Sequence, residues 1–109
     1  MTSSETDRLQ PDYCAERLRA LGDPLRLRIV ALLRQGEMTV GDIAQFLDVE
    51  LVNASHHLQN LRHAGLVTPR REGRFIYYSL HKDLLPGGQR KSRQLLDLGC
   101  CRIELPKQN

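Results

Sequence analysis

The 109-residue chain contains no tryptophan, and aromatic residues make up only 5% of it. No apolar run approaches the roughly 20 residues of a membrane-spanning helix, and no apolar stretch near Met1 resembles a signal peptide. These absences predict a cytoplasmic chain with no membrane partner. Hydrophobic residues at 40% and charged residues at 27% are ordinary values for a globular protein. The length suits one domain with one modest core.

The chain also lacks the short motifs of common catalytic sites. It has no Gly-rich phosphate loop, no H-E-x-x-H and no nucleophile elbow. A cysteine hydrolase would need a histidine beside its thiol in a pocket, which is hard to build in a chain of this size. We therefore expect no enzymatic activity.

Cysteine is scarce, but its placement is unusual. Cys14 lies near one end of the chain, and Cys100 and Cys101 are adjacent near the other. Because cytoplasmic thiols are normally reduced, the three cysteines indicate metal or redox chemistry rather than a disulfide framework. A disulfide between adjacent cysteines would be strained, since their Cα atoms are only about 3.8 Å apart. The alternative is that cysteines fill the core as small apolar residues, which suits Cys14 better than the adjacent pair.

Positive charge is concentrated in one third of the chain. Residues 61–94 carry eight Lys/Arg and two Asp/Glu, whereas residues 1–60 carry six and nine. This local excess favours a polyanionic partner, nucleic acid first, although a solvated basic face would give the same pattern.

Apolar periodicity and capping residues divide the chain into helices and one hairpin. One helix face is expected to carry Cys14, Leu18 and Leu21. We predict a flexible tail over 1–10, a domain over 11–98 and a cysteine-bearing tail over 99–109. Within the domain the expected elements are a helix from Pro11, a helix from Pro24, helices over 40–47 and 51–64, a β-hairpin over 67–80 and a last helix over 89–98.

The two central helices and the hairpin form a recognisable unit. A short helix, a three-residue turn and a longer helix are typical of a helix-turn-helix, whose second helix presents its N-terminal residues to base edges. The basic hairpin that follows is a wing, placed to contact phosphates or the minor groove. The predicted fold is mainly α with a β-hairpin wing, a winged helix-turn-helix. The predicted DNA contacts are Val52, Asn53, Ser55, His56, Gln59, Arg70, Arg71 and Arg74.

A solvent-exposed polar face is the alternative interpretation of those helix residues. The adjacent histidines His56 and His57 cannot chelate one ion, because neighbours on a helix point about 100° apart. We expect His57 to be partly buried and hydrogen-bonded.

Two patterns in the second half of the unit are specific. They are S-x-H-L-x-x-L-x-x-A-G-L-V from Ser55 to Val67, and R-x-G-R-x-x-Y-Y from Arg71. With LGDPLRLRIVALL at 21–33 and GEMTVGDIAQFL at 36–47, they make residues 13–98 resemble the ArsR/SmtB family of winged-helix repressors. The resemblance implies a homodimer, formed by the first and last helices, on a palindromic double-stranded operator. It also implies release when an inducer binds, often a metal or metalloid.

The chain departs from the family at two inducer sites. TVGDI at 39–43 stands where cysteine-based arsenic sensors have C-V-C-D-L, and residues 89–98 offer Asp97 but no histidine for a zinc site. Sensing would therefore use Cys14, Cys100 and Cys101. Three thiolates suit trivalent arsenic or antimony, whereas zinc and cadmium prefer a fourth ligand. Because the resemblance brings the first helix and the chain end together, we expect this site to bridge two subunits.

The predicted function is a sequence-specific DNA-binding repressor. It would release its operator when trivalent arsenic, antimony or another thiophilic metal ion binds the cysteines. A thiol-redox or persulfide sensor of the same fold remains open. So does a non-sensing winged-helix regulator or protein-interaction module. The sequence leaves four things undetermined: the operator, the regulated genes, the inducer, and whether the cysteine site lies within one subunit or between two.

Overall fold

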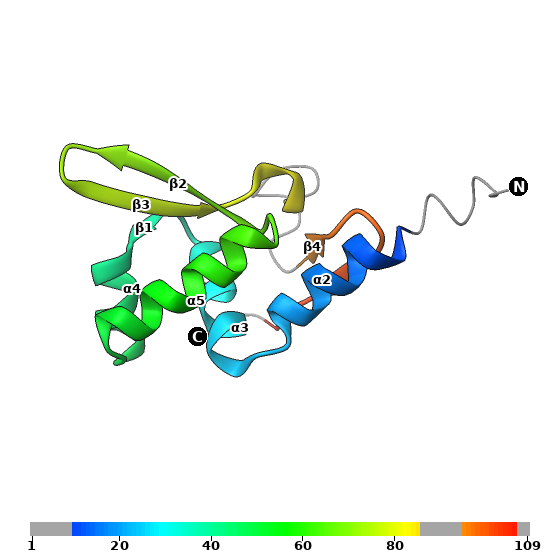
Figure 1. The fold of residues 1–109 in the computed structure, drawn as a ribbon, viewed down its shortest axis with the longest axis horizontal. Coiled ribbons are helices and arrows are strands. Elements are labelled where there is room, and N and C mark those ends of the chain that lie inside the picture. Colours follow the sequence, from blue (N-terminus) through cyan, green and yellow to red (C-terminus); the bar gives the residue numbers. More distant parts are fainter. Residues whose placement is uncertain (1–9, 86–94, 107–109) are drawn as a thin grey trace, which may run out of the picture.

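The computed structural model describes residues 10–85 and 95–106 of the chain. A hairpin projects from one end of the helical part of the molecule, while a second hairpin lies behind the first helix (Figure 1). The helices are α2 (Pro11–Leu21), α3 (Pro24–Leu33), α4 (Val40–Leu47) and α5 (Leu51–His63), with a short 3₁₀ helix η1 (Lys82–Leu84). The strands are β1 (Met38–Thr39), β2 (Val67–Glu72), β3 (Phe75–Leu80), β4 (Leu95–Asp97) and β5 (Arg102–Glu104).

Side-chain caps define where two of the helices begin. The Asp23 carboxylate accepts hydrogen bonds from the N–H groups of Leu25 and Arg26 at the start of α3, both at 3.0 Å. The bond from the Arg26 N–H lowers the pKa of the Asp23 carboxyl below its usual value. At α4, the Thr39 hydroxyl accepts from the N–H of Asp42 at 3.1 Å. Because such caps satisfy otherwise unpaired donors, the sequence predicts both helix starts, and the structure confirms them.

The wing is an antiparallel hairpin of β2 and β3, as predicted. Its register pairs Thr68 with Ser79 and Arg70 with Tyr77, and Gly73 takes a positive φ of 62° in the turn. Strand β1, which the sequence analysis does not predict, pairs with β3 on its other edge, giving the order β1-β3-β2. This third strand joins the wing to the start of α4, the first helix of the helix-turn-helix.

The core lies between the helices and the two hairpins. One continuous cluster contains Ile29 from α3, Ile43 from α4, Leu58 from α5, and Leu96 and Leu98 from the second hairpin, all at 0% exposure. Among the described residues, no helix combines the length and apolar character needed to cross a bilayer.

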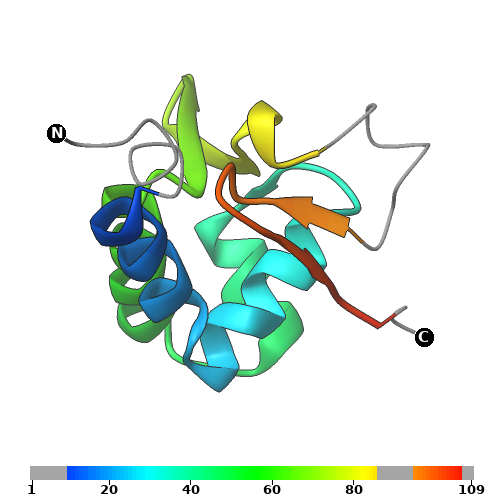
Figure 2. The same cartoon turned by 90° about the vertical axis from the view of Figure 1, so that its right-hand side faces the viewer.

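The predicted last helix is wrong where the structure describes it. Residues 95–97 form β4, which pairs with β5 so that Leu96 faces Ile103. Leu98 is in neither a helix nor a strand, and residues 89–94 of the predicted helix lie outside the described residues. Figure 2 shows the second hairpin, in orange and red, next to α3, whose C-cap residue Arg34 donates to the Leu95 carbonyl at 2.7 Å. The prediction that the first and last helices form the dimer interface therefore does not hold for residues 95–98, because they are not helical.

Candidate functional site

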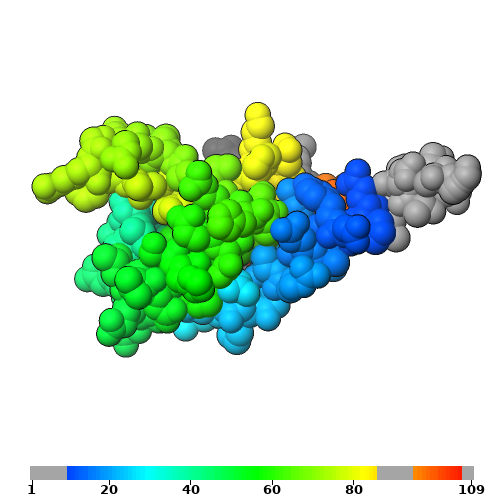
Figure 3. All heavy atoms as spheres, viewed as in Figure 1, coloured from blue at the N-terminus to red at the C-terminus, as the bar shows by residue number. Residues whose placement is uncertain are grey.

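The second helix of the helix-turn-helix, α5, is buried on one side and polar on the other. Ala54, Leu58 and Leu61 are fully buried, as their spacing predicts. On the opposite side Val52 is 80% exposed, and Asn53 and His56 are also exposed. Figure 3 shows α5, in green, crossing one face of the molecule beside the projecting wing. The first two turns of α5 therefore present an apolar group and short polar groups to the surroundings.

Three further side chains of α5 lie at the edges of this face. Ser55 and Gln59 are half-buried, and the Gln59 amide donates a hydrogen bond to the Tyr78 hydroxyl of β3 at 3.2 Å. Gln59 therefore links α5 to the wing. The position of Gln59 around the helix axis does not predict this contact, because its partner lies on another element. His57 is half-buried, and its Nδ1 lies 3.1 Å from Nη1 of Arg26. The expectation of a partly buried, hydrogen-bonded His57 is confirmed.

The three wing arginines differ in their surroundings. Arg70 donates to the carboxylates of Glu37 and Glu72 at 2.8 and 2.9 Å and stacks on the Tyr77 ring. The hydrogen bonds to these carboxylates, Glu37 first, raise the pKa of Arg70 above its usual value. Arg71 is exposed on β2, and Arg74 is exposed in the turn, with its guanidinium 5.5 Å from the centre of the Phe75 ring. Arg70 is thus the wing arginine whose charge is compensated by carboxylates.

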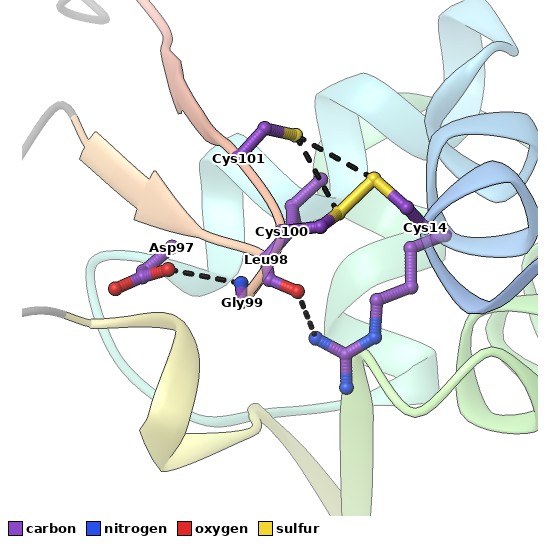
Figure 4. The surroundings of a disulfide bond; sticks show 7 residues. Cys14, Asp97, Leu98, Gly99, Cys100 and Cys101 are labelled. Carbon is purple, nitrogen blue, oxygen red and sulfur yellow. Dashed lines mark hydrogen bonds between the residues drawn. A yellow bond between two sulfur atoms is a disulfide. The ribbon is translucent and has the colours of Figure 1, made fainter. Parts of the chain in front are cut away.

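The three cysteines meet at one point, between α2 and the turn that joins β4 to β5 (Figure 4). Their three Sγ atoms lie within 4.8 Å of one another. Cys14 and Cys100 form a disulfide, and the Cys101 thiol lies 3.9 Å from both of their sulfur atoms. Cys14 is 8% exposed, while Cys100 and Cys101 are half-buried. The sequence analysis selects these three residues, and a single chain brings them together.

Two features of the cysteines differ from the sequence-based expectation. The resemblance favours a site that bridges two subunits, whereas one chain brings all three sulfur atoms together in this structure. The cysteines were also expected to be reduced, whereas Cys14 and Cys100 are paired. The position of the β4–β5 turn explains both differences. The β4–β5 turn folds back against α2 and places Cys100 within disulfide reach of Cys14, at a Cα separation of 6.0 Å.

One residue next to this cluster, Arg17, is not among the site residues predicted from the sequence. Arg17, one turn after Cys14 on α2, is only 7% exposed, whereas Leu18, expected on the buried face, is 43% exposed. Arg17 Nη1 donates to the Leu98 carbonyl at 3.2 Å. Its spacing from Cys14 and Leu21 gave a signal, since positions i, i+3 and i+7 share a helix face, but arginine is rarely buried unless paired.

Comparison with known proteins identifies the family. A helix-turn-helix domain family matches residues 21–70. The transcriptional repressor SdpR of Bacillus subtilis is 43% identical over 67 residues, which cover 62% of this chain and 74% of SdpR. The chain belongs to the ArsR/SmtB family. A solved structure of this type is the homodimeric winged helix-turn-helix domain of Mb0332 from Mycobacterium bovis, named as a possible ArsR-family regulator. It is 37% identical, with a TM-score of 0.67, and the match covers 74% of this chain and 73% of Mb0332.

Other relatives are matched over less than two thirds of their own length. The CadC homolog of Staphylococcus aureus, named as a cadmium resistance regulator, is 39% identical over 71 residues. The match covers 64% of this chain but only 59% of that relative. The matches to SdpR and Mb0332 show the family and the winged-helix fold, and the relatives named here are transcriptional regulators.

Proposed function

We propose that the protein is a DNA-binding repressor that leaves its operator when trivalent arsenic or antimony binds Cys14, Cys100 and Cys101. The observation that supports this most directly is that the three sulfur atoms lie within 4.8 Å of one another. The fold brings them together although Cys14 and Cys100 are 86 positions apart in the sequence. In the reduced protein, arsenous acid would exchange its three hydroxyl groups for the sulfur atoms of three thiols. Three As–O bonds break, three As–S bonds form, and each hydroxyl group leaves with a thiol proton as water.

The number of sulfur atoms favours a trivalent ion. Arsenic(III) and antimony(III) take three sulfur ligands in a pyramid, so Cys14, Cys100 and Cys101 complete their coordination. Zinc and cadmium usually take four ligands. Among the described residues, the cluster offers three cysteines and no fourth His, Cys, Asp or Glu. Another thiophilic ion would thus need a ligand from water or from a second molecule.

DNA recognition in this proposal uses α5 and the wing. Val52, Asn53, Ser55, His56 and Gln59 lie on or beside the exposed side of α5, and we assign base contacts to them. Arg71 and Arg74 would contact phosphates, while Arg70 would position the wing through its carboxylate partners. The protein would bind double-stranded DNA as a cytoplasmic homodimer. Exposed apolar side chains on α2, Tyr13 and Leu18, support a role for this helix in the interface.

Replacing Arg74 with alanine is expected to weaken binding to all DNA sequences by a similar factor. Arg74 is exposed at the wing turn, where a guanidinium meets phosphate oxygens rather than base edges. Loss of one phosphate contact should reduce the slope of log K against log salt concentration by about one. The measurement is a salt titration on operator and on unrelated DNA, with exposed Arg19→Ala on α2 as the control. Equal slopes for Arg74→Ala and wild type would favour a protein-interaction module.

Replacing Asn53 or His56 with alanine is expected to act on sequence preference. Each removes a side chain on the exposed face of α5, and loss of a base contact typically costs about 1–3 kcal/mol. Binding to unrelated DNA should change little. His63→Ala is the matched control, because His63 is exposed at the other end of the same helix. Equal losses of affinity for operator and unrelated DNA would show that Asn53 and His56 do not recognise bases.

The Cys14–Cys100 disulfide supports a second candidate, a thiol-redox sensor of the same fold. Hydrogen peroxide would oxidise the two thiols to the disulfide, with their two hydrogens passing to the two water molecules formed. This reaction needs Cys14 and Cys100 but not Cys101. A persulfide donor is another oxidant of the same pair.

The two candidates are separated by titrating the reduced protein on the DNA upstream of its own gene. Arsenite, antimonite, cadmium, zinc, peroxide and a persulfide donor are added in turn. Release by arsenite and antimonite, with one ion bound per subunit, would support the metalloid proposal. Release by peroxide or persulfide alone would support the redox candidate.

A further inference from the structure

Arg17 connects the cysteine cluster to the DNA-binding unit. Its guanidinium is buried and donates in two directions, from Nη1 to the Leu98 carbonyl at 3.2 Å and from Nη2 to the Gly65 carbonyl at 3.4 Å. The Leu98 carbonyl lies 81 positions away along the chain and the Gly65 carbonyl 48 positions away. Cys14 lies one helical turn before Arg17 on α2, so one helix carries both a sulfur ligand and this double contact.

The Leu98 end of the contact belongs to the turn that carries the thiols. Leu98 also donates its own N–H to the Cys101 carbonyl at 2.8 Å. The Gly99 N–H donates to the Asp97 carboxylate at 2.9 Å, and Gly99 has a φ of 93°, which glycine adopts readily. These bonds make residues 97–101 one compact turn (Figure 4). A displacement of Cys101 is therefore transmitted to the Leu98 carbonyl that Arg17 holds.

The Gly65 end belongs to the junction between α5 and the wing. Gly65 follows the C-cap residue Ala64 and has a φ of 78°. Its N–H donates to the Arg62 carbonyl, and the Leu66 N–H donates to the Leu61 carbonyl, both at 2.9 Å. Strand β2 of the wing starts two residues later, at Val67. The carbonyl that Arg17 contacts is thus fixed to the end of α5 and to the start of the wing.

The chemistry of this position requires arginine. A permanent charge at 7% exposure is costly unless it is hydrogen-bonded, and the two carbonyls supply those bonds. A planar guanidinium presents several donors in a fixed fork and so reaches both carbonyls at once, which a lysine ammonium does not do in the same geometry. Arg17 Nε has no hydrogen-bond partner among the described residues. The contact therefore depends on two bonds, one to each side.

We infer that Arg17 is the positioning residue through which the state of the three thiols alters the placement of α5 and the wing. This inference rests on the proposed function and names its route of regulation. An ion bound by Cys14, Cys100 and Cys101 would set the distances between the three sulfur atoms, which differ from those in the disulfide state, and so shift the β4–β5 turn and the Leu98 carbonyl relative to α2. The guanidinium would follow, and its contact with Gly65 would change. The binding of an ion to the cysteines would then change the free energy of operator binding through this one side chain.

The test compares Arg17→Gln with Arg34→Gln in the full-length protein. Arg34 also donates to a carbonyl of the second hairpin, that of Leu95, but this bond starts at the C-cap of α3 and does not include Gly65. Amide hydrogen exchange is measured at Gly65 and Leu66 in reduced, arsenite-treated and peroxide-oxidised protein. Operator affinity is measured in the same three states. In addition, Arg17→Lys keeps the positive charge but removes the planar guanidinium that donates to both carbonyls.

We expect the state of the thiols to change exchange at Gly65 and Leu66 in wild type and Arg34→Gln, but not in Arg17→Gln or Arg17→Lys. The ratio of operator affinities without and with arsenite, typically about 5 to 150 for coupled sites, should fall towards one in both Arg17 variants. Arsenite should still bind them, since their three cysteines are intact.

Two results would overturn the inference. One is a wild-type protein whose exchange at Gly65 and Leu66 does not respond to arsenite or oxidation, a measurement that needs no variant to fold. The other is an Arg17 variant that transmits the response as wild type does. If wild-type exchange responds through Arg17 while arsenite leaves operator affinity unchanged, the proposed inducer response fails but the route through Arg17 stands.

Discussion

Replacing Cys101 with serine is expected to abolish release from the operator by arsenite while leaving the Cys14–Cys100 disulfide able to form. Cys101 supplies the third sulfur of the cluster, 3.9 Å from each of the other two, but takes no part in the disulfide. Without it a trivalent ion loses one of its three sulfur ligands. The coupling between inducer and DNA, typically about 1–3 kcal/mol, should then disappear. Operator binding is measured in reduced protein with increasing arsenite.

Cys14→Ser is the informative companion variant. It should lose both the arsenite response and the disulfide, because Cys14 takes part in each. A wild-type arsenite response in Cys14→Ser would reduce Cys14 to a core-filling residue and the site to two thiols at most. Normal responses from Cys14→Ser, Cys100→Ser and Cys101→Ser alike would show that the cysteines are not the sensor.

Oxidation of the wild-type protein is expected to raise its free energy of unfolding by about 4 kcal/mol. The Cys14–Cys100 disulfide joins residues 86 positions apart, so it closes most of the chain into one loop. A long closed loop restricts the unfolded ensemble more than a short one, and this entropy is the main source of the stabilisation. Denaturant unfolding of the reduced and oxidised proteins measures the difference, and the oxidised protein should show the lower m value because its crosslinked unfolded chain exposes less surface.

The cysteine variants provide the controls for this prediction. Cys101→Ser should keep the difference between oxidised and reduced protein, because its disulfide partners are unchanged. Cys100→Ser should show none. A wild-type protein whose stability is the same in both states would contradict the prediction, and with it the pairing of Cys14 with Cys100.

Local chemistry explains why the helix-turn-helix and the wing could be predicted. Asp23 before Pro24, and Thr39 before Val40, mark helix starts through bonds that span only two or three residues. The inward face of α5 follows from helical spacing, and Gly73 marks the turn of the wing. The three cysteines were found for a different reason: few side chains other than thiols bind soft ions.

The second hairpin and Arg17 could not be predicted in the same way. The apolar positions Leu95, Leu96 and Leu98 fit a helix or a strand, and only pairing with Arg102–Glu104 makes Leu95–Asp97 a strand. The buried state of Arg17 depends on carbonyls of Gly65 and Leu98, which reach it through the fold. Such long-range partners leave no periodic pattern around the residue itself.

The most direct test of a thiol-controlled repressor is one ratio. It is the operator affinity of fully reduced wild-type protein divided by its affinity after one equivalent of arsenite per subunit. We expect a ratio of about 5 to 150, which returns to one when a competing dithiol removes the arsenic. A ratio of one at saturating arsenite, in protein that binds one arsenic per subunit, would contradict it.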